Sequence, residues 1–182
     1  LGDNADQMIK QLKRHEGLVT HCYQDHLGYN TIGYGRLIEK GMGGITEAEA
    51  DYLLMNDLTK FMKTAQSYDY FDKLNEPRKA VVVNMLFNLG QSRYEGFQNF
   101  ASALSAGHYE KAAEEMLSGS NGGKSRWYTQ VGRRAEELAE QMRRASGNNL
   151  RPVEGSPSAG ISVSDYFNVA SVLLVYGLAA ED

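Results

Sequence analysis

The chain of 182 residues has little of several residue types, and each shortage narrows its class. It has one cysteine, Cys22, which excludes an internal disulfide framework, so the fold has to be stabilised by packing alone. Apolar residues still make up 42% of the sequence. That fraction is enough for one good core, or for one core and a small lobe.

The chain also lacks an excess of positive charge. It has 19 Lys and Arg against 23 Asp and Glu, which gives a formal net charge of −4. This acidity, without a concentrated basic and aromatic stripe, disfavours nucleic-acid binding. An anionic partner would then be bound through hydrogen bonds and stacking, or through a local basic face. The chain offers Lys124, Arg126, Arg133, Arg134, Arg143 and Arg144 for one.

A long hydrophobic run is missing as well. The apolar part of 161–182 is about a dozen residues, too short for a membrane span. It follows a linker at 148–160, where two prolines lie among Gly and Ser. We expect 161–182 to pack on the preceding domain or to dock to a larger assembly, rather than to contact a membrane.

The first feature that suggests chemistry is Glu16, at the predicted end of a helix. Asn4 or Asp6 is available as the N-cap of this helix, and Gly17 is the expected left-handed residue after its last turn. One apolar face is formed by Met8, Ile9, Leu12 and His15. The negative end of the helix dipole disfavours a second negative charge, which favours a protonated Glu16, as a general acid requires. The alternative is a solvated glutamate of the last turn.

Asp25 has different surroundings. Residues 18–23 and 29–32 are expected strands, and the turn between them places Asp25 where it is solvated or bonded to amides and stays ionised. Two carboxylates in such different settings are a candidate acid and base. By itself, an aspartate in a hairpin turn is more often structural.

His15, His21, Cys22 and His26 lie close in sequence, but no second cluster follows at ligand spacing. We therefore expect no metal site and no cofactor. Cys22 is expected to be a part-buried hairpin residue, with a reactive thiol as the alternative.

The rest of the chain favours helices. Thr46 with Glu49 forms a capping box that opens a long helix to about Ala65. Pro77 and Gly90 bracket a helix over 78–89. Shorter helices are expected near 97–106, 109–117 and 133–144. Residues 118–124 look like a flexible insertion.

The spacing of Glu16, Asp25 and Thr31, with Glu-Gly before it and Thr-Ile-Gly-Tyr-Gly after it, resembles the catalytic segment of phage-type lysozymes, glycoside hydrolase family 24. Three further motifs follow in family order, so that the resemblance covers roughly residues 6–147. They are Asn84–Gly90, Gly96-Phe97, and Ser125–Gln130 with Arg134-Ala135.

The resemblance implies an α+β, mainly α, lysozyme-like fold. Residues 1–147 would form the catalytic domain, with a small N-terminal β-hairpin lobe at about 17–45 and a long connecting helix. The remainder, about 46–147, would form an all-helical C-terminal lobe, to which the N-terminal helix also belongs. The insertion at 118–124 would then form a rim of the cleft.

The family's catalytic roles carry over to three residues. Glu16 would protonate the glycosidic oxygen, and Asp25 and Thr31 would activate a water on the opposite face of the sugar, with inversion. An inverting enzyme sets its carboxylates apart to leave room for that water. Arg134 aligns with an arginine of the family that pairs with the catalytic glutamate. Such a partner favours the charged form of the glutamate, whereas the helix dipole disfavours it.

Four positions align with substrate-binding residues of the family. Leu37 and Phe87 match its pattern, whereas Phe100 and Glu115 stand where serine and asparagine are expected, and Phe100 is equally suited to the core. Arg36 replaces a frequent histidine that pairs with an acidic residue of the helical lobe. An arginine serves the same electrostatic end.

The implied function is that of a muramidase that cleaves the β-1,4 bond between N-acetylmuramic acid and N-acetylglucosamine in bacterial peptidoglycan. With no secretory pattern at the N-terminus, an endolysin would fold in the host cytoplasm and reach the wall through a holin. The alternative is a virion-associated lysozyme-fold component, tethered through 161–182, that penetrates the wall or only binds saccharide.

Overall fold

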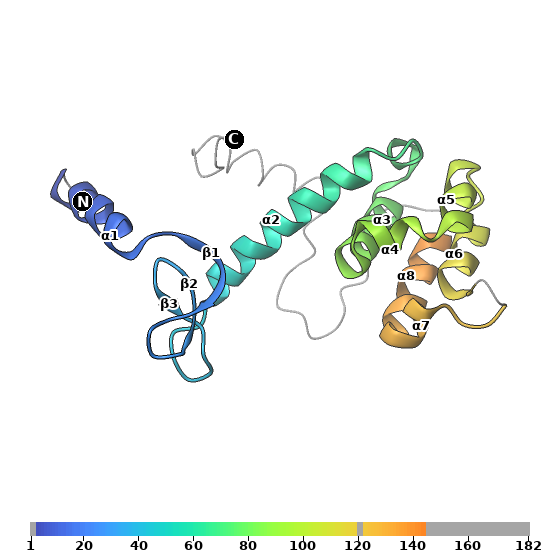
Figure 1. Cartoon of the computed structure of the whole chain (residues 1–182). Coiled ribbons are helices and arrows are strands. Elements are labelled where there is room, and N and C mark those ends of the chain that lie inside the picture. The colour runs from blue at the N-terminus through green and yellow to red at the C-terminus, as the bar shows by residue number, and fades with distance from the viewer. Residues whose placement is uncertain (1–2, 120–121, 145–182) are drawn as a thin grey trace. The chain divides into compact units, whose positions relative to one another are not determined.

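The computed structural model describes residues 3–119 and 122–144, so the expected linker at 148–160 and the segment 161–182 lie outside the described residues. The chain divides into two compact units, one up to Leu53 and one from Leu54. Figure 1 shows the order of the elements along the chain, and each unit is described separately below.

The first unit contains one helix and a small sheet. Helix α1 spans Asp3–Glu16 and begins before the predicted caps, Asn4 and Asp6, which therefore lie inside it. It ends as predicted: Gly17 has a φ of 70°, and its N–H donates to the Lys13 carbonyl at 3.1 Å.

The sheet has one strand more than the sequence predicts. Strands β1 (Val19–Gln24), β2 (Asn30–Gly33) and β3 (Arg36–Leu37) are antiparallel in the order β1-β2-β3. A two-residue strand is too short to give an alternating pattern, so β3 has no signal in the sequence.

Helix α2 (Glu47–Gln66) begins in the first unit and ends in the second. Its predicted capping box is confirmed, because the N–H of Glu49 donates to the Thr46 hydroxyl at 3.2 Å and the Glu49 carboxylate accepts from the Thr46 N–H at 2.8 Å. The long helix that the sequence predicts to about Ala65 is present.

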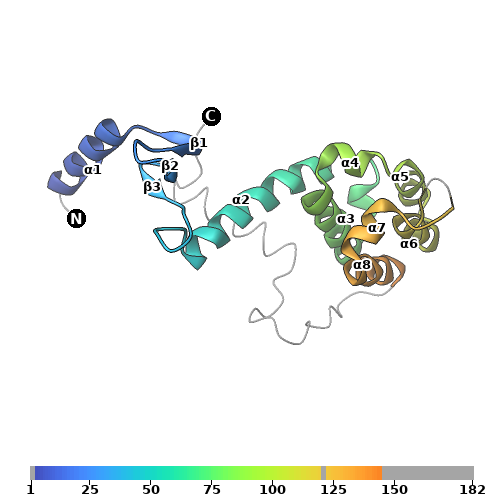
Figure 2. The same cartoon turned by 60° about the horizontal axis from the view of Figure 1, so that its bottom comes forward.

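The described part of the second unit is built from helices (Figure 2). It holds the core. Helix α3 (Glu76–Leu89) is followed by Gly90, which has a φ of 73° and fulfils the prediction for that end. Two short helices, α4 and α7, were not predicted. The elements are η1 (Phe71–Lys73), α3 (Glu76–Leu89), α4 (Gln91–Glu95), α5 (Gln98–Ser105), α6 (Tyr109–Leu117), α7 (Arg126–Val131) and α8 (Arg133–Arg143).

Helix α8 lies against α3 and α6, and α5 lies against α6. Fully buried side chains from these helices form one cluster, which includes Met85, Phe100, Leu104 and Met142. The predominance of helix beside one small antiparallel sheet confirms the α+β, mainly α, lysozyme-like class. None of the helices among the described residues has the length and apolarity needed to cross a bilayer.

Candidate active site

The Glu16 carboxylate lies beside the turn that joins β2 to β3. A Cβ atom placed on Gly35 would be 3.2 Å from Glu16 Oε2, and Gly35 has a φ of 77°. A side chain there would be strained and would also press on the carboxylate. Gly35 therefore leaves room for the Glu16 carboxylate, which within the described first unit has no hydrogen-bond donor.

The Asp25 side chain closes the turn between β1 and β2. Its Oδ1 atom accepts hydrogen bonds from the N–H groups of Leu27 and Tyr29, both at 2.9 Å. The N–H of Asp25 also donates to the Tyr29 carbonyl at 3.0 Å. One carboxylate oxygen is thus held by the turn, and no described residue donates to the other, Oδ2.

Thr31 is tied to the same residue as Asp25. Its hydroxyl donates to the Tyr29 carbonyl at 2.9 Å, and its side chain is 2% exposed. The Tyr29 backbone therefore contacts both predicted water-binding side chains, through its N–H for Asp25 and its C=O for Thr31. The sequence does not indicate this role of Tyr29, because any residue type supplies those two groups.

Leu37, a predicted substrate contact, is the β3 partner of Thr31. Directly paired residues of neighbouring strands project to the same face of a sheet. The short strand β3 therefore places Leu37 next to the Thr31 hydroxyl, which the sequence spacing alone did not indicate.

Arg36 pairs with Glu49, which the sequence predicts only as part of the helix cap. Its guanidinium lies 2.9 Å and 3.2 Å from the two Glu49 oxygens and also donates to the Gly44 carbonyl at 3.1 Å. The Thr46 hydrogen bonds lower the pKa of Glu49, and Arg36 acts in the same direction. This group ties β3, and with it the Gly35 turn, to the start of α2.

Arg134 is half-buried in the helical unit. Its Nη2 and Nε atoms donate to Asn84 Oδ1 at 2.7 Å and 3.2 Å. Asn84 is neutral, so within the described helical unit the guanidinium has an oriented partner but no carboxylate. Its pairing with Glu16 remains a prediction. Asn84, which the sequence offered only as part of a motif, is the residue that orients Arg134.

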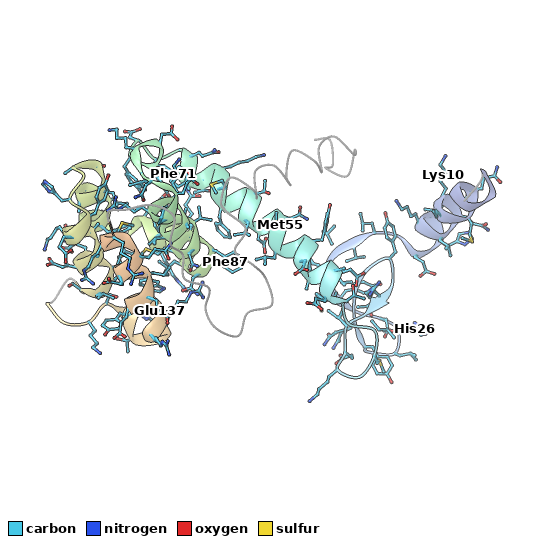
Figure 3. The ribbon with its side chains drawn as sticks, turned by 180° about the vertical axis from the view of Figure 1, so that it is seen from behind. Lys10, His26, Met55, Phe71, Phe87 and Glu137 are labelled. Carbon is cyan, nitrogen blue, oxygen red and sulfur yellow. The ribbon has the colours of Figure 1, made fainter. Side chains whose placement is uncertain are left out.

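The predicted substrate residues of the helical unit differ in accessibility. Phe87 lies on α3 (Figure 3) and is 38% exposed. Its ring contacts that of Phe61 edge to face, with ring centroids 5.8 Å apart. Phe100 is 1% exposed and packs against Tyr94. A saccharide does not reach a ring buried in this way, so the structure contradicts the substrate role of Phe100 and supports its place in the core.

Glu115 is held by its neighbours. Lys111 lies 2.9 Å from its carboxylate, and the Asn99 amide donates to it at 3.2 Å. The hydrogen bond from Lys111 lowers the pKa of Glu115, and the one from Asn99 adds to this, against an opposing effect of burial. The Glu115 carboxylate thus already has two partners, and its role in substrate binding stays a prediction.

Cys22 is exposed, which corrects the expectation of a part-buried residue. The reason is that β1 is exposed along most of its length within the described chain, so neither of its faces is covered. Among the described residues, no three His, Cys, Asp or Glu side chains gather as metal ligands would.

Comparison with known proteins places the chain among lysozymes. The model of the phage lysozyme family matches residues 13–137. The pre-baseplate central spike protein Gp5 of Enterobacteria phage T4 is 29% identical over 164 residues, covering 75% of this chain and 28% of that protein. The probable T4-type lysozyme 1 of Dictyostelium discoideum is 27% identical over 133 residues, covering 58% of this chain and 78% of that protein.

The chain thus spans little more than a quarter of the length of Gp5 but most of the length of the second relative. The family match covers all three predicted catalytic residues and Arg134, and it supports glycoside hydrolase activity of the lysozyme type. The chain belongs to the phage lysozyme family.

Proposed function

We propose that the protein is a muramidase that hydrolyses the β-1,4 bond between N-acetylmuramic acid and N-acetylglucosamine of bacterial peptidoglycan with inversion. Glu16 donates the proton to the leaving oxygen, and Asp25 with Thr31 holds the attacking water. The observation that carries the proposal is the hydrogen bonding of Asp25 and Thr31 to one residue, Tyr29.

These hydrogen bonds determine what each group offers a water molecule. The Thr31 hydroxyl uses its hydrogen on the Tyr29 carbonyl, so its remaining capacity is as an acceptor. Asp25 Oδ1 is occupied by two N–H groups, which leaves Oδ2 as an acceptor. A water that donates one hydrogen to each residue keeps a lone pair free to attack the anomeric carbon, and Asp25 takes its proton as general base.

Glu16 supplies the acid. It lies at the C-terminal end of α1, and Gly35 leaves its carboxylate room to meet a substrate oxygen. Arg134 and Phe87 complete the proposal from the helical unit, Arg134 as the partner of the glutamate and Phe87 as a saccharide contact.

The stereochemistry of the product tests the role of the water. Purified protein is incubated with peptidoglycan, and the anomer formed first is identified by NMR before mutarotation. We expect the α-anomer, because a water held on the face opposite the leaving group inverts a β-linkage. Retention of the β-anomer would show instead that a carboxylate attacks the sugar directly.

A second candidate is a role within the phage particle, either in wall penetration or as a saccharide-binding module. The observation that favours it is the match to a protein named as a baseplate spike, of which this chain spans about a quarter. The endolysin reading requires the free protein in the host cytoplasm and release through a holin. Residues 161–182, outside the described part, would be the tether to the particle.

Mass spectrometry of purified particles separates the two locations. A stoichiometric amount of the protein in particles, lost when residues 148–182 are deleted, supports the virion role. Abundance in the infected-cell cytosol with none in particles supports the endolysin.

A further inference from the structure

The peptide group between Tyr29 and Asn30 is held at both of its ends. Its carbonyl accepts hydrogen bonds from the Thr31 hydroxyl at 2.9 Å and from the Asp25 N–H at 3.0 Å. Its N–H, which belongs to Asn30, donates to Oε1 of Glu39 at 3.0 Å. The two residues that hold the water in the proposed mechanism thus contact one end of this peptide group, and Glu39 contacts the other.

The bond to Glu39 replaces a bond that a regular sheet would make. The Asn30 carbonyl accepts from the N–H of Ile38, the first residue after β3, at 2.9 Å. In a regular antiparallel pair, Asn30 would in return donate its N–H to the Ile38 carbonyl. The Glu39 carboxylate takes the place of that carbonyl. A side chain therefore completes the ladder beside β2, at the point where the short strand β3 has ended.

The backbone that carries Glu39 is itself fixed. The Met42 N–H donates to the Glu39 carbonyl at 3.0 Å, and the Gly44 N–H donates to the Leu37 carbonyl at 2.8 Å. A Cβ on Gly43 would lie 2.6 Å from the Leu37 oxygen, so this close approach requires glycine. Glu39 is half-buried in this loop. Its carboxylate is therefore presented to β2 from an ordered segment.

The charge of the Glu39 carboxylate has no competing cation. None of the ion pairs among the described residues involves Glu39, whereas Glu49 of the same unit is paired with Arg36. A hydrogen bond to a charged acceptor is stronger than one between neutral groups. A carboxylate on the N–H also polarises the peptide group, which makes the carbonyl at its other end a better acceptor.

A peptide group is planar, so its N–H and C=O cannot turn independently. The bond to Glu39 therefore fixes the direction of the Tyr29 carbonyl, to which the Thr31 hydroxyl donates. We propose that Glu39 is a positioning residue of the hydrolysis, which acts through this peptide group on the lone pair that Thr31 presents to the attacking water. The inference rests on the proposed function, because it extends the way in which Asp25 and Thr31 hold that water.

The test separates the hydrogen bond from the charge. Glu39→Ala removes the acceptor, whereas Glu39→Gln loses the charge but keeps an oxygen for the Asn30 N–H. Glu47→Ala is the matched control, because Glu47 is an exposed glutamate of the same unit. New reducing ends from peptidoglycan are measured over a range of substrate concentrations, with the full chain in each case.

We expect Glu39→Ala to lose about tenfold or more in kcat, with KM within about twofold of the parent, because a misdirected water slows the attack without weakening saccharide binding. Glu39→Gln should keep kcat within about threefold of the parent, and Glu47→Ala should match the parent. A parental kcat in Glu39→Ala, an equal loss in Glu39→Gln, or a change in KM alone would overturn the proposal.

An NMR measurement that needs no cleavage keeps this result separate from the proposed function. Three-bond couplings to the Thr31 methyl carbon report the rotamer of its side chain, and we expect one rotamer in the parent and in Glu39→Gln. Glu39→Ala should show couplings averaged over rotamers. Parental couplings in Glu39→Ala would overturn the positioning role, whereas a parent that cleaves no peptidoglycan would refute the muramidase proposal whatever the couplings show.

Amide hydrogen exchange in the parent tests the bond without any substitution, and so does not depend on the folding of Glu39→Ala. The Asn30 amide should exchange more slowly than that of His26, an exposed residue of the turn between β1 and β2. Equal exchange rates for the two amides would overturn the proposal.

Discussion

The structure within each of the two units is stabilised by a different kind of interaction. In the helical unit, side chains such as Met85, Leu86 and Met142 are completely buried in one cluster. In the first unit, Thr31 is the one buried side chain among residues 7–53, and hydrogen bonds of turns and caps define the structure. The proposed chemistry thus rests on local polar geometry, whereas stability rests on apolar packing elsewhere in the chain.

The largest test of this contrast truncates one large apolar side chain in each unit, a buried one in the helical unit and an exposed one in the first unit. Phe100→Ala should destabilise the protein by about 3–5 kcal/mol, because it empties a buried site. Leu27→Ala, at a residue 67% exposed in the β1–β2 turn, should change stability by less than about 0.5 kcal/mol. Chemical denaturation followed by circular dichroism measures both. A Phe100→Ala protein of normal stability and low activity would restore the substrate role for this residue.

A buried arginine gives the next largest effect. Arg78 is 6% exposed, donates to the Met142 and Arg143 carbonyls at 2.9 Å and 3.4 Å, and stacks on Tyr109. Arg78→Ala leaves the end of α8 without these donors, and we expect a loss of about 2–4 kcal/mol.

Arg133→Ala is the control for Arg78→Ala, since its side chain is 86% exposed and it should cost less than about 1 kcal/mol. Similar unfolding midpoints for the two variants would show that the hydrogen bonds from Arg78 to the end of α8 do not stabilise the protein.

In the first unit, two substitutions of Asp25 separate fold from chemistry. Asp25→Asn retains an oxygen for the Leu27 and Tyr29 N–H groups but loses the general base, so activity should fall about 100-fold or more with little change in stability. Asp25→Ala should in addition lose about 1–2 kcal/mol with the turn. Activity of Asp25→Asn near that of the parent would remove Asp25 from the mechanism.

The smallest effect is the pH dependence at Glu115, whose pKa is lowered by Lys111 in the folded protein. A folded-state pKa below the unfolded one adds stability above the unfolded value, near 4.5, that is lost as pH falls through the folded pKa. The melting temperature of Glu115→Gln should therefore be lower than that of the parent at pH 7, and the gap should close below pH 4.5. A gap that does not narrow as the pH falls below 4.5 would argue against this ion pair.

The sequence predicted the features that local rules determine. Gly17 and Gly90 end their helices, and Thr46 with Glu49 caps α2, because each depends on neighbours within four residues. The three catalytic candidates came from a family pattern, and the turn chemistry of Asp25 agrees with the structure.

The sequence did not predict the features that distant contacts determine. The hydrogen bond from Arg134 to Asn84 joins residues 50 apart, and the one from Arg78 to the Met142 carbonyl joins residues 64 apart. Neither pairing has a periodic signal. Helices α4 and α7 are five and six residues long, too short for a helical pattern to appear.

The central claim is that Glu16 supplies the catalytic proton from a unit whose stability does not depend on it. Clearing of peptidoglycan suspensions is measured for the parent, for Glu16→Gln and for Glu47→Gln, an exposed glutamate in the first turn of α2. We predict that Glu16→Gln loses on the order of 10²–10⁴-fold in rate with an unchanged melting temperature, while Glu47→Gln keeps the parent rate. Clearing by Glu16→Gln at the parent rate would contradict the account.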